Sequence, residues 1–285
     1  MTLREAIAEY KAGGKAIAHF NFSDSNQLKA IAEAAIETGL PVIVGLSEGE
    51  REYFPLAHAR ALVNLYRAQG IQIFLNADHT YSFEKVKQAI DDGVDSVVVD
   101  GAKLPFEENA ALVKRCVEYA RASGRDVVME SELGYIGQSS KMLDELPEGV
   151  SLENLTTVEE ATRFVGASGI DCFAPAIGNI HGILKNAKEP KLHADRVKEI
   201  ADATGVALVL HGASGNSEEE IGACIKAGVA VVHINTELRV LYRKSIEASF
   251  AAHPDEVAPY KFLAPTVAEM KSYVSHKLKV FARAQ

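Results

Sequence analysis

The chain has 285 residues, and 30 Lys and Arg against 39 Asp and Glu give it a formal net charge of −9. Its composition, 47% hydrophobic and 24% charged, is that of a globular protein and excludes disordered and fibrous classes. The negative charge argues against nucleic acid and anionic membrane as partners. Three separated cysteines without a C-x-x-C motif indicate reduced thiols and a cytoplasmic location. No apolar run is as long as a membrane span, which needs about 18 residues. The first residues lack the apolar core of a signal peptide.

Short β-rich segments alternate with helical patterns along almost the whole chain. Several of them, such as 97–99 and 206–210, are apolar at every position, which is typical of parallel strands buried on both faces. Eight strands are predicted, at residues 16–22, 41–47, 71–78, 96–101, 126–132, 171–178, 207–212 and 230–235.

Amphipathic or capped stretches between these strands predict helices. They cover residues 27–38, 83–92, 107–122 and 217–227, and a further helix is expected at about 266–283. Ser217 followed by three Glu is typical of a helix start. Seven glycines fall between a helix and the next strand, where glycine commonly ends a helix: Gly39, Gly70, Gly93, Gly124, Gly169, Gly205 and Gly228.

Eight strand-then-helix units predict an α/β fold, a (β/α)8 TIM barrel. We expect one domain over residues 1–285 with an extra C-terminal helix. The rival, a doubly wound open sheet, would carry a glycine fingerprint after its first strand, and segment 19–23 contains no Gly. Segment 133–156 is too long for an ordinary connection, so we interpret it as a functional lid.

Polar residues stand at the carboxyl ends of the predicted strands. Chemistry in a TIM barrel gathers at those ends, so we expect these side chains to converge on one mouth. In chain order they are Asn21, Ser47, Asp78, His79, Asp100, Glu132, His181, His211 and Asn235.

His79, His181 and His211 are candidate ligands of a catalytic zinc ion, which typically has three protein ligands and one open position. Asp100 and Glu132 could hold a second cation, orient the imidazoles, or only face solvent at the rim. Asp78 is a candidate proton shuttle or, alternatively, a helix cap. Neighbours in a strand point to opposite faces, so Asp78 and His79 can serve one site only if the strand ends there.

Small and hydroxyl residues follow the last three strands. Loops at this position of a TIM barrel commonly bind phosphate through backbone N–H groups and a helix N-terminus. The candidate residues are Gly182, Gly212, Ser214, Asn235 and Thr236. They suggest a phosphorylated substrate held beside the metal.

An ordered set of motifs carries a family resemblance. The segments are 76–79 (Asn-Ala-Asp-His), Asp100 with 104–109, 130–134 (Glu-Ser-Glu-Leu-Gly), 178–182 (Gly-Asn-Ile-His-Gly), 210–215 (Leu-His-Gly-Ala-Ser-Gly) and 235–239 (Asn-Thr-Glu-Leu-Arg). With these motifs the chain resembles the class II (metal-dependent) ketose-bisphosphate aldolases, the fructose- and tagatose-bisphosphate enzymes. The resemblance extends from about residue 16 to residue 281.

The resemblance implies a role for each candidate residue. His79, His181 and His211 would bind Zn²⁺, Asp78 would be the catalytic acid/base, and Asp100 and Glu132 would hold a second or alternative divalent metal. The phosphate of dihydroxyacetone phosphate would lie on Gly182, Gly212, Ser214, Asn235 and Thr236. From their strand-end positions, Asn21 and Ser47 are further candidates for binding substrate. The resemblance further implies a monovalent cation near the phosphate and a homodimer or homotetramer.

Two departures from the family pattern concern the other half of the substrate. The loop after the fifth strand normally offers an acidic C–H base, but residues 138–141 read Gln-Ser-Ser-Lys, and acids return only at Asp144, Glu145 and Glu148. Many members have an arginine that binds the distal phosphate, and at the corresponding position this chain has Tyr260.

These departures leave several functions open. Fructose 1,6-bisphosphate is the first substrate to test, and tagatose 1,6-bisphosphate or another ketose phosphate is the alternative. A non-catalytic phosphosugar-binding paralogue and a barrel metal-dependent hydrolase are further hypotheses.

Overall fold

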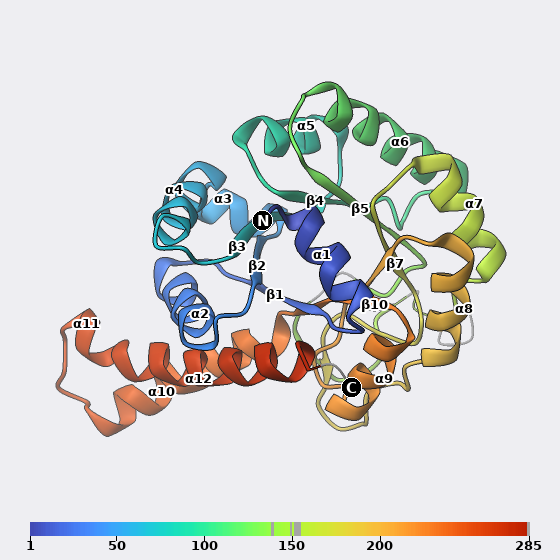
Figure 1. Cartoon of the computed structure of the whole chain (residues 1–285). Helices are drawn as coiled ribbons and strands as arrows, with labels where there is room; N and C mark the ends of the chain where they lie inside the picture. The colour runs from blue at the N-terminus through green and yellow to red at the C-terminus, as the bar shows by residue number, and fades with distance from the viewer. Residues whose placement is uncertain (138–139, 149, 151–154, 284–285) are drawn as a thin grey trace.

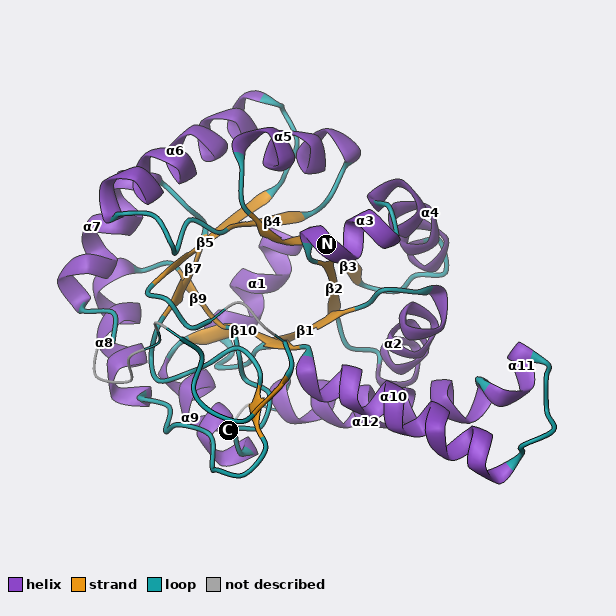
Figure 2. Cartoon of the chain, turned by 180° about the vertical axis from the view of Figure 1, so that it is seen from behind, coloured by secondary structure: helices purple, strands orange, loops and turns teal. Residues whose placement is uncertain are grey.

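The computed structural model describes residues 1–137, 140–148, 150 and 155–283. Eight parallel strands close into a barrel in the spatial order β1-β10-β9-β7-β5-β4-β3-β2 (Figures 1 and 2). This confirms the predicted (β/α)8 fold and all eight strands. Their bounds are β1 (Ile17–Asn21), β2 (Val42–Leu46), β3 (Ile73–Thr80), β4 (Ser96–Val99), β5 (Val128–Leu133), β7 (Cys172–Pro175), β9 (Ala207–Leu210) and β10 (Val229–Ile234).

Helices surround the barrel as an outer layer (Figure 2). They are α2 (Ser25–Thr38), α4 (Leu56–Arg67), α5 (Phe83–Asp92), α6 (Phe106–Ala122), α7 (Val158–Ser168), α8 (Ala194–Thr204), α9 (Glu218–Ala227) and α10 (Thr236–Ala252). Ser217 caps α9 with Glu220 as predicted. All seven glycines expected at helix ends have positive φ, between +67° and +129°, a conformation that glycine adopts without steric cost.

A helix that the sequence pattern did not predict, α1 (Leu3–Ala12), lies across one opening of the ring of strands (Figure 1). Leu3, Ile7 and Tyr10 of α1 join an apolar cluster with the first inward-facing residues of the strands, such as Ile17 and Phe74. Arg4 hydrogen-bonds Asp126 and Asp171 at the same end. This end of the barrel is therefore closed, and the site must open at the other.

The chain ends in a helical arm. After α10 come the short α11 (Pro259–Phe262) and α12 (Ala264–Phe281), which corresponds to the predicted last helix. α12 packs on α2 and α10, and the tip at α11 projects away from the barrel (Figure 1). Among the described helices, none combines the length and the apolar character needed to cross a membrane.

The long segment after β5 is joined to the loop that carries His181. Its strand β6 (Met142–Leu143) pairs in parallel with β8 (Ile183–Leu184), directly after Gly182. Residues 138–139, 149 and 151–154 of the predicted lid lie outside the described residues. The short sheet β6–β8 therefore ties residues 142–143 to the predicted metal-binding and phosphate-binding loop.

The inside of the barrel changes from apolar to polar along four of the described strands, β1, β3, β5 and β10. Ile17 and Phe74 lie in the apolar cluster against α1, whereas the inward-facing residues two positions later, His19 and Asn76, are buried and polar. The same change occurs in β5 and β10. Side chains alternate between the two faces of a strand, so positions two apart share the interior. The polar layers lead towards the open end.

Candidate active site

An irregularity in β3 brings Asp78 and His79 to the same site. The strand continues to Thr80, but its pairing with β4 shifts register between Ala77 and Thr80. Within that bulge His79 has φ +33°, the one positive value among the described non-glycine residues. The expectation that the strand must end at this point is wrong, because a β-bulge re-aims one side chain without ending the strand.

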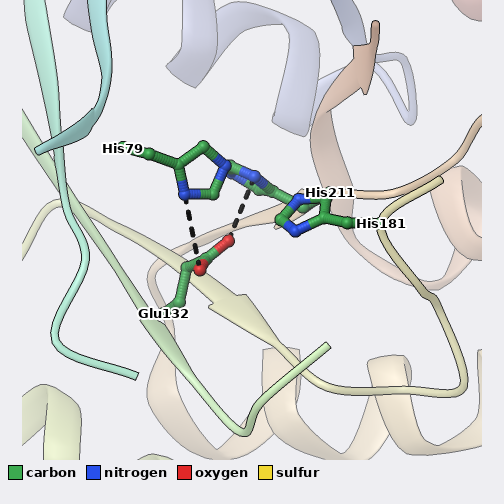
Figure 3. A group of neighbouring side chains, drawn as sticks. All are labelled: His79, Glu132, His181 and His211. Carbon is green, nitrogen blue, oxygen red and sulfur yellow. Dashed lines mark ion pairs between the residues drawn. The ribbon is translucent and has the colours of Figure 1, made fainter. Parts of the chain in front are cut away.

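The three predicted histidine ligands converge, together with Glu132 (Figure 3). One ligand atom from each of the four side chains lies within 4.8 Å of the others. The ring centroid of His79 lies 4.9 Å from that of His181 and 5.1 Å from that of His211. The His181 and His211 centroids lie 5.9 Å apart. The three pairs of rings meet edge to face, with interplanar angles of 78°, 81° and 70°.

A hydrogen bond on one ring nitrogen of each histidine determines which nitrogen remains available. His79 Nδ1–H donates to Asp100 Oδ2 at 2.9 Å, and His181 Nδ1–H donates to the Gly137 carbonyl at 2.7 Å. His211 Nε2–H donates to Glu130 Oε1 at 2.7 Å. His79 and His181 thus keep Nε2 for a ligand and His211 keeps Nδ1, an arrangement typical of metal-binding histidines.

The electrostatics of the cluster favour a cation. Burial lowers the pKa of His181 to about 4 and holds that of His211 well below its ordinary value, so both rings are neutral with a lone pair available. Burial also acts to lower the pKa of His79, but Asp78, Glu132 and Asp100 outweigh it and raise that pKa well above its ordinary value. The surrounding carboxylates therefore create a field that stabilises positive charge.

Two buried carboxylate oxygens test whether a metal fits. Asp78 Oδ1 and Glu132 Oε1 have no hydrogen-bond partner in the described part of the chain. Glu132 Oε1 lies 3.1 Å from His211 Nδ1, and burial raises the pKa of Glu132 to about 8. The Glu132 oxygen and the His211 nitrogen both carry lone pairs, so at this distance they need a proton or a cation between them. Because the donor set is imidazole and carboxylate, it fits Zn²⁺ or a similar divalent ion.

Asp78 is held by Asn21 at the end of β1. Its Oδ2 accepts a hydrogen bond from Asn21 Nδ2 at 2.9 Å, and the same amide group donates to Glu50 Oε2 at 2.9 Å. Burial acts to raise the pKa of Asp78, but His79, His19, His211 and the Asn21 bond outweigh it and lower that pKa below its ordinary value. Asp78 is therefore an ionised carboxylate with one oxygen available beside the histidine cluster.

The predicted phosphate residues line the same cavity, which encloses about 160 Å³. Gly182 and Gly212 have φ +111° and +60°, and a Cβ at Gly212 would lie 2.3 Å from the Ile180 carbonyl oxygen. Ser214 Oγ accepts from the Glu237 N–H in the first turn of α10. A helix start beside two crowded glycine loops is an arrangement that can bind an anion through backbone N–H groups. The other predicted residues on the lining are Asn21, Ser47, Asp78, His79, His181, His211, Asn235 and Thr236.

Some predicted residues have a different place. Asp100 binds His79 Nδ1 and does not belong to the four-residue ligand group. Asp144, Glu145 and Glu148 are exposed and are not on the described cavity lining, and Asp144 pairs with Lys185 at 2.9 Å. Tyr260 is 77% exposed on α11 at the end of the arm.

Sequence reasoning assigned no role to several residues at or below the site. These are His19, Glu50, Glu130, His233 and Arg239. His19 and His233 stack at 3.6 Å between ring centroids, and His233 stacks on His211 at 3.9 Å. The signal that would have found three of them is a polar residue two positions before a strand-end residue, as in the pairs 19/21, 130/132 and 233/235.

Comparison with known proteins agrees with this geometry. The family described as "Fructose-bisphosphate aldolase class-II" matches residues 1–285. The fructose-bisphosphate aldolase of Geobacillus stearothermophilus is 35% identical over 287 residues, covering 99% of this chain and 96% of that protein. A probable fructose-bisphosphate aldolase of Bacillus subtilis (strain 168) is also 35% identical and covers 99% of this chain and 97% of its own length.

Solved structures give the same result. The YdjI aldolase from Escherichia coli K12 superposes with a TM-score of 0.81 at 28% identity, covering 99% of this chain and 96% of that one. A putative fructose-1,6-bisphosphate aldolase from Coccidioides immitis gives 0.82 at 28% identity, with 98% and 95% covered. The resemblance inferred from the ordered motifs is confirmed. The chain therefore belongs to the class II fructose-bisphosphate aldolase family, whose members are lyases that cleave ketose bisphosphates.

Proposed function

We propose that this protein is a zinc-dependent aldolase that reversibly cleaves fructose 1,6-bisphosphate to dihydroxyacetone phosphate and glyceraldehyde 3-phosphate. The observation that supports it most directly is the grouping of His79, His181, His211 and Glu132 around one point, beside crowded glycine loops. Tagatose 1,6-bisphosphate is the alternative substrate, since the two sugars differ only in stereochemistry at one carbon of the aldehyde half.

The proposed roles follow from the contacts. His79, His181 and His211 would hold the zinc, with Asp100, Gly137 and Glu130 fixing the rings, and Glu132 would supply a further or alternative ligand. When bound, a zinc ion acts as a Lewis acid that stabilises the negative charge left on the ketone oxygens after carbon–carbon cleavage.

The protein's own side chains would perform the remaining steps. Asp78, held by Asn21, would take the proton from the hydroxyl group of the bond that breaks and return it to the aldehyde oxygen in the reverse reaction. Gly182, Gly212, Ser214, Asn235 and Thr236 would bind the phosphate of dihydroxyacetone phosphate. That remote contact fixes the reacting carbons in place and thereby lowers the entropic part of the barrier.

Metal removal tests this function. Purified protein should contain zinc by elemental analysis, lose cleavage after EDTA treatment, and recover it on addition of Zn²⁺. Borohydride with substrate should trap nothing, because no Schiff base forms. Undiminished cleavage by metal-free protein would refute the metal mechanism. A coupled assay with fructose 1,6-bisphosphate and tagatose 1,6-bisphosphate in parallel would decide the sugar.

We also propose a cytoplasmic homo-oligomer. The buried free thiols Cys116, Cys172 and Cys224 are consistent with a reducing compartment. The arm exposes Phe250, Val257 and Tyr260, large apolar side chains that a second subunit could cover. Light scattering coupled to gel filtration should give the mass of a dimer or tetramer, and a monomer at micromolar concentration would refute this part.

A further inference from the structure

Glu50 joins β1, α3 and α10 next to residues that line the cavity, such as Asn21, Ser47 and Arg239. It is 7% exposed and lies in α3 (Glu48–Tyr53), directly after β2. Its Oε2 accepts hydrogen bonds from Asn21 Nδ2 and Ser47 Oγ, both at 2.9 Å. Its Oε1 accepts from Ser23 Oγ at 3.3 Å and from Arg239 Nη2 at 2.5 Å. With this many donors around it, the carboxylate is held in one place.

Arg239 is the cationic member of this group. It lies in the first turn of α10, lines the cavity, and its side chain remains 38% exposed. Within the ranges that the structure describes, Glu50 is the acceptor for its guanidinium group. A guanidinium carries five N–H donors, so others remain available to a molecule in the cavity.

The pair connects the start of α10, which follows β10, to the ends of the neighbouring strands β1 and β2. Arg239 lies three positions after Thr236, and its guanidinium group bonds Glu50 in α3, directly after β2. Asn21 connects Glu50 to Asp78 through two hydrogen bonds of 2.9 Å. Because Asp78 would act at the bond that breaks, the pair faces the half of the substrate that leaves as the aldehyde.

We propose that Glu50 determines how strongly the enzyme prefers phosphorylated over uncharged aldehydes. This inference rests on the proposed aldolase function. A fixed carboxylate 2.5 Å from Arg239 offsets most of the guanidinium's positive charge and occupies one of its donors. A phosphate dianion at the aldehyde end therefore gains little binding free energy from Arg239. The remaining N–H donors of Arg239 can still bind an uncharged polyol aldehyde, so its affinity is reduced less.

Glu50→Gln tests the proposal, because it keeps the side-chain shape and removes the charge. The assay is condensation of dihydroxyacetone phosphate with glyceraldehyde 3-phosphate and, separately, with glyceraldehyde. The quantity compared is the ratio of kcat/KM for the two aldehydes. Both react with the same loaded enzyme, so damage to Asn21, Asp78 or the metal site lowers both rates and cancels in the ratio. We expect the ratio to rise about tenfold towards the phosphorylated aldehyde, a change of about 1.4 kcal/mol.

Glu52→Gln is the matched control, since it removes the same charge from the same helix at an exposed position outside the cavity. Its ratio should stay within about twofold of the wild type, as for surface changes generally. An unchanged or lower ratio in Glu50→Gln, or an equal rise in Glu52→Gln, would overturn the proposal.

A second variant covers the case in which Glu50→Gln does not fold. Arg239→Gln leaves the carboxylate without its cation, so the ratio should fall about tenfold towards glyceraldehyde. An unchanged ratio would again overturn the proposal.

A separate experiment tests the underlying aldolase function. In heavy water, the wild type should exchange the α-proton next to the ketone of dihydroxyacetone phosphate for deuterium. Absence of that exchange would refute the aldolase function, and this inference with it.

Discussion

Gly212 offers the sharpest test of the proposed phosphate site, because the chain contains a matched control at the other end of β9. Gly205 precedes that strand and has φ +71°, with nothing within 4 Å of a Cβ built on it. Gly212 follows the strand with φ +60°, and a Cβ there would lie 2.3 Å from the Ile180 carbonyl oxygen. The two positions have similar positive φ angles and differ in crowding.

The expected magnitudes follow from that difference. Alanine in the left-handed region costs about 1–2 kcal/mol at either position, and each kcal/mol lowers Tm by about 2–4 °C in a domain of this size. At Gly212 the loop must also move by about 1 Å from residue 180, next to the ligand His181. A displacement of about 1 Å in an active site commonly costs about 100-fold in rate.

Gly205→Ala should therefore lower Tm by a few degrees and keep kcat/KM for fructose 1,6-bisphosphate within about twofold of the wild type. Gly212→Ala should lose about 100-fold in kcat/KM, with a raised KM because the phosphate loop has moved. The assays are thermal unfolding and coupled steady-state kinetics on metal-loaded protein. Wild-type kinetics in Gly212→Ala, with only the stability loss of Gly205→Ala, would show that this loop does not bind the phosphate.

Three further predictions concern the metal site and the closed end of the barrel. His181→Ala should lose both zinc and activity. Asp78→Ala should lose turnover but keep its zinc, as measured by elemental analysis. If Asp78→Ala loses the metal as well, the role that we assign to Asp78 is wrong. Glu130→Gln should weaken zinc binding by about 10–100-fold in chelator competition, because Glu130 orients His211; unchanged affinity would contradict this. Burial acts to raise the pKa of Asp171, but hydrogen bonds from two arginines and a backbone N–H lower it below its ordinary value. Its stabilising effect is present above the unfolded pKa of about 3.9 and is lost as the pH falls through the folded pKa. The Tm difference between wild type and Asp171→Asn should therefore be largest at neutral pH and shrink in acid, and a difference independent of pH would contradict this reasoning.

The strands and the strand-end residues could be predicted because both follow from local patterns. A buried parallel strand is a short apolar run, and a polar residue at its end reads directly from the sequence. Asp78 and His79 show where this reasoning stops. Their joint use depends on a bulge in the pairing of β3 with β4, which arises between strands and leaves no local signal in the sequence.

The missed residues act through partners distant in the chain. Glu50 pairs with Arg239 across 189 positions, and His19 stacks on His233 only because β1 and β10 are neighbours in the closed ring. The helix α1 was missed although its start carries a local signal, the capping box of Thr2 and Glu5. Its role is to cover the apolar interior at one end, and that demand is visible only once the barrel has closed.

The change from apolar to polar residues along β1, β3, β5 and β10 separates stability from chemistry within one chain. The first inward-facing residues, sealed by α1, supply apolar packing, and the later ones carry ionisable groups that would be costly to bury alone. Because the sealed half and the outer helices hold the barrel closed, the residues at the open half can be exchanged without loosening the scaffold. A laboratory that wishes to redirect this enzyme to new sugars should therefore alter residues at the open end that neither hold the metal nor move the proton, such as Glu50 and Arg239, and leave the first inward-facing positions unchanged.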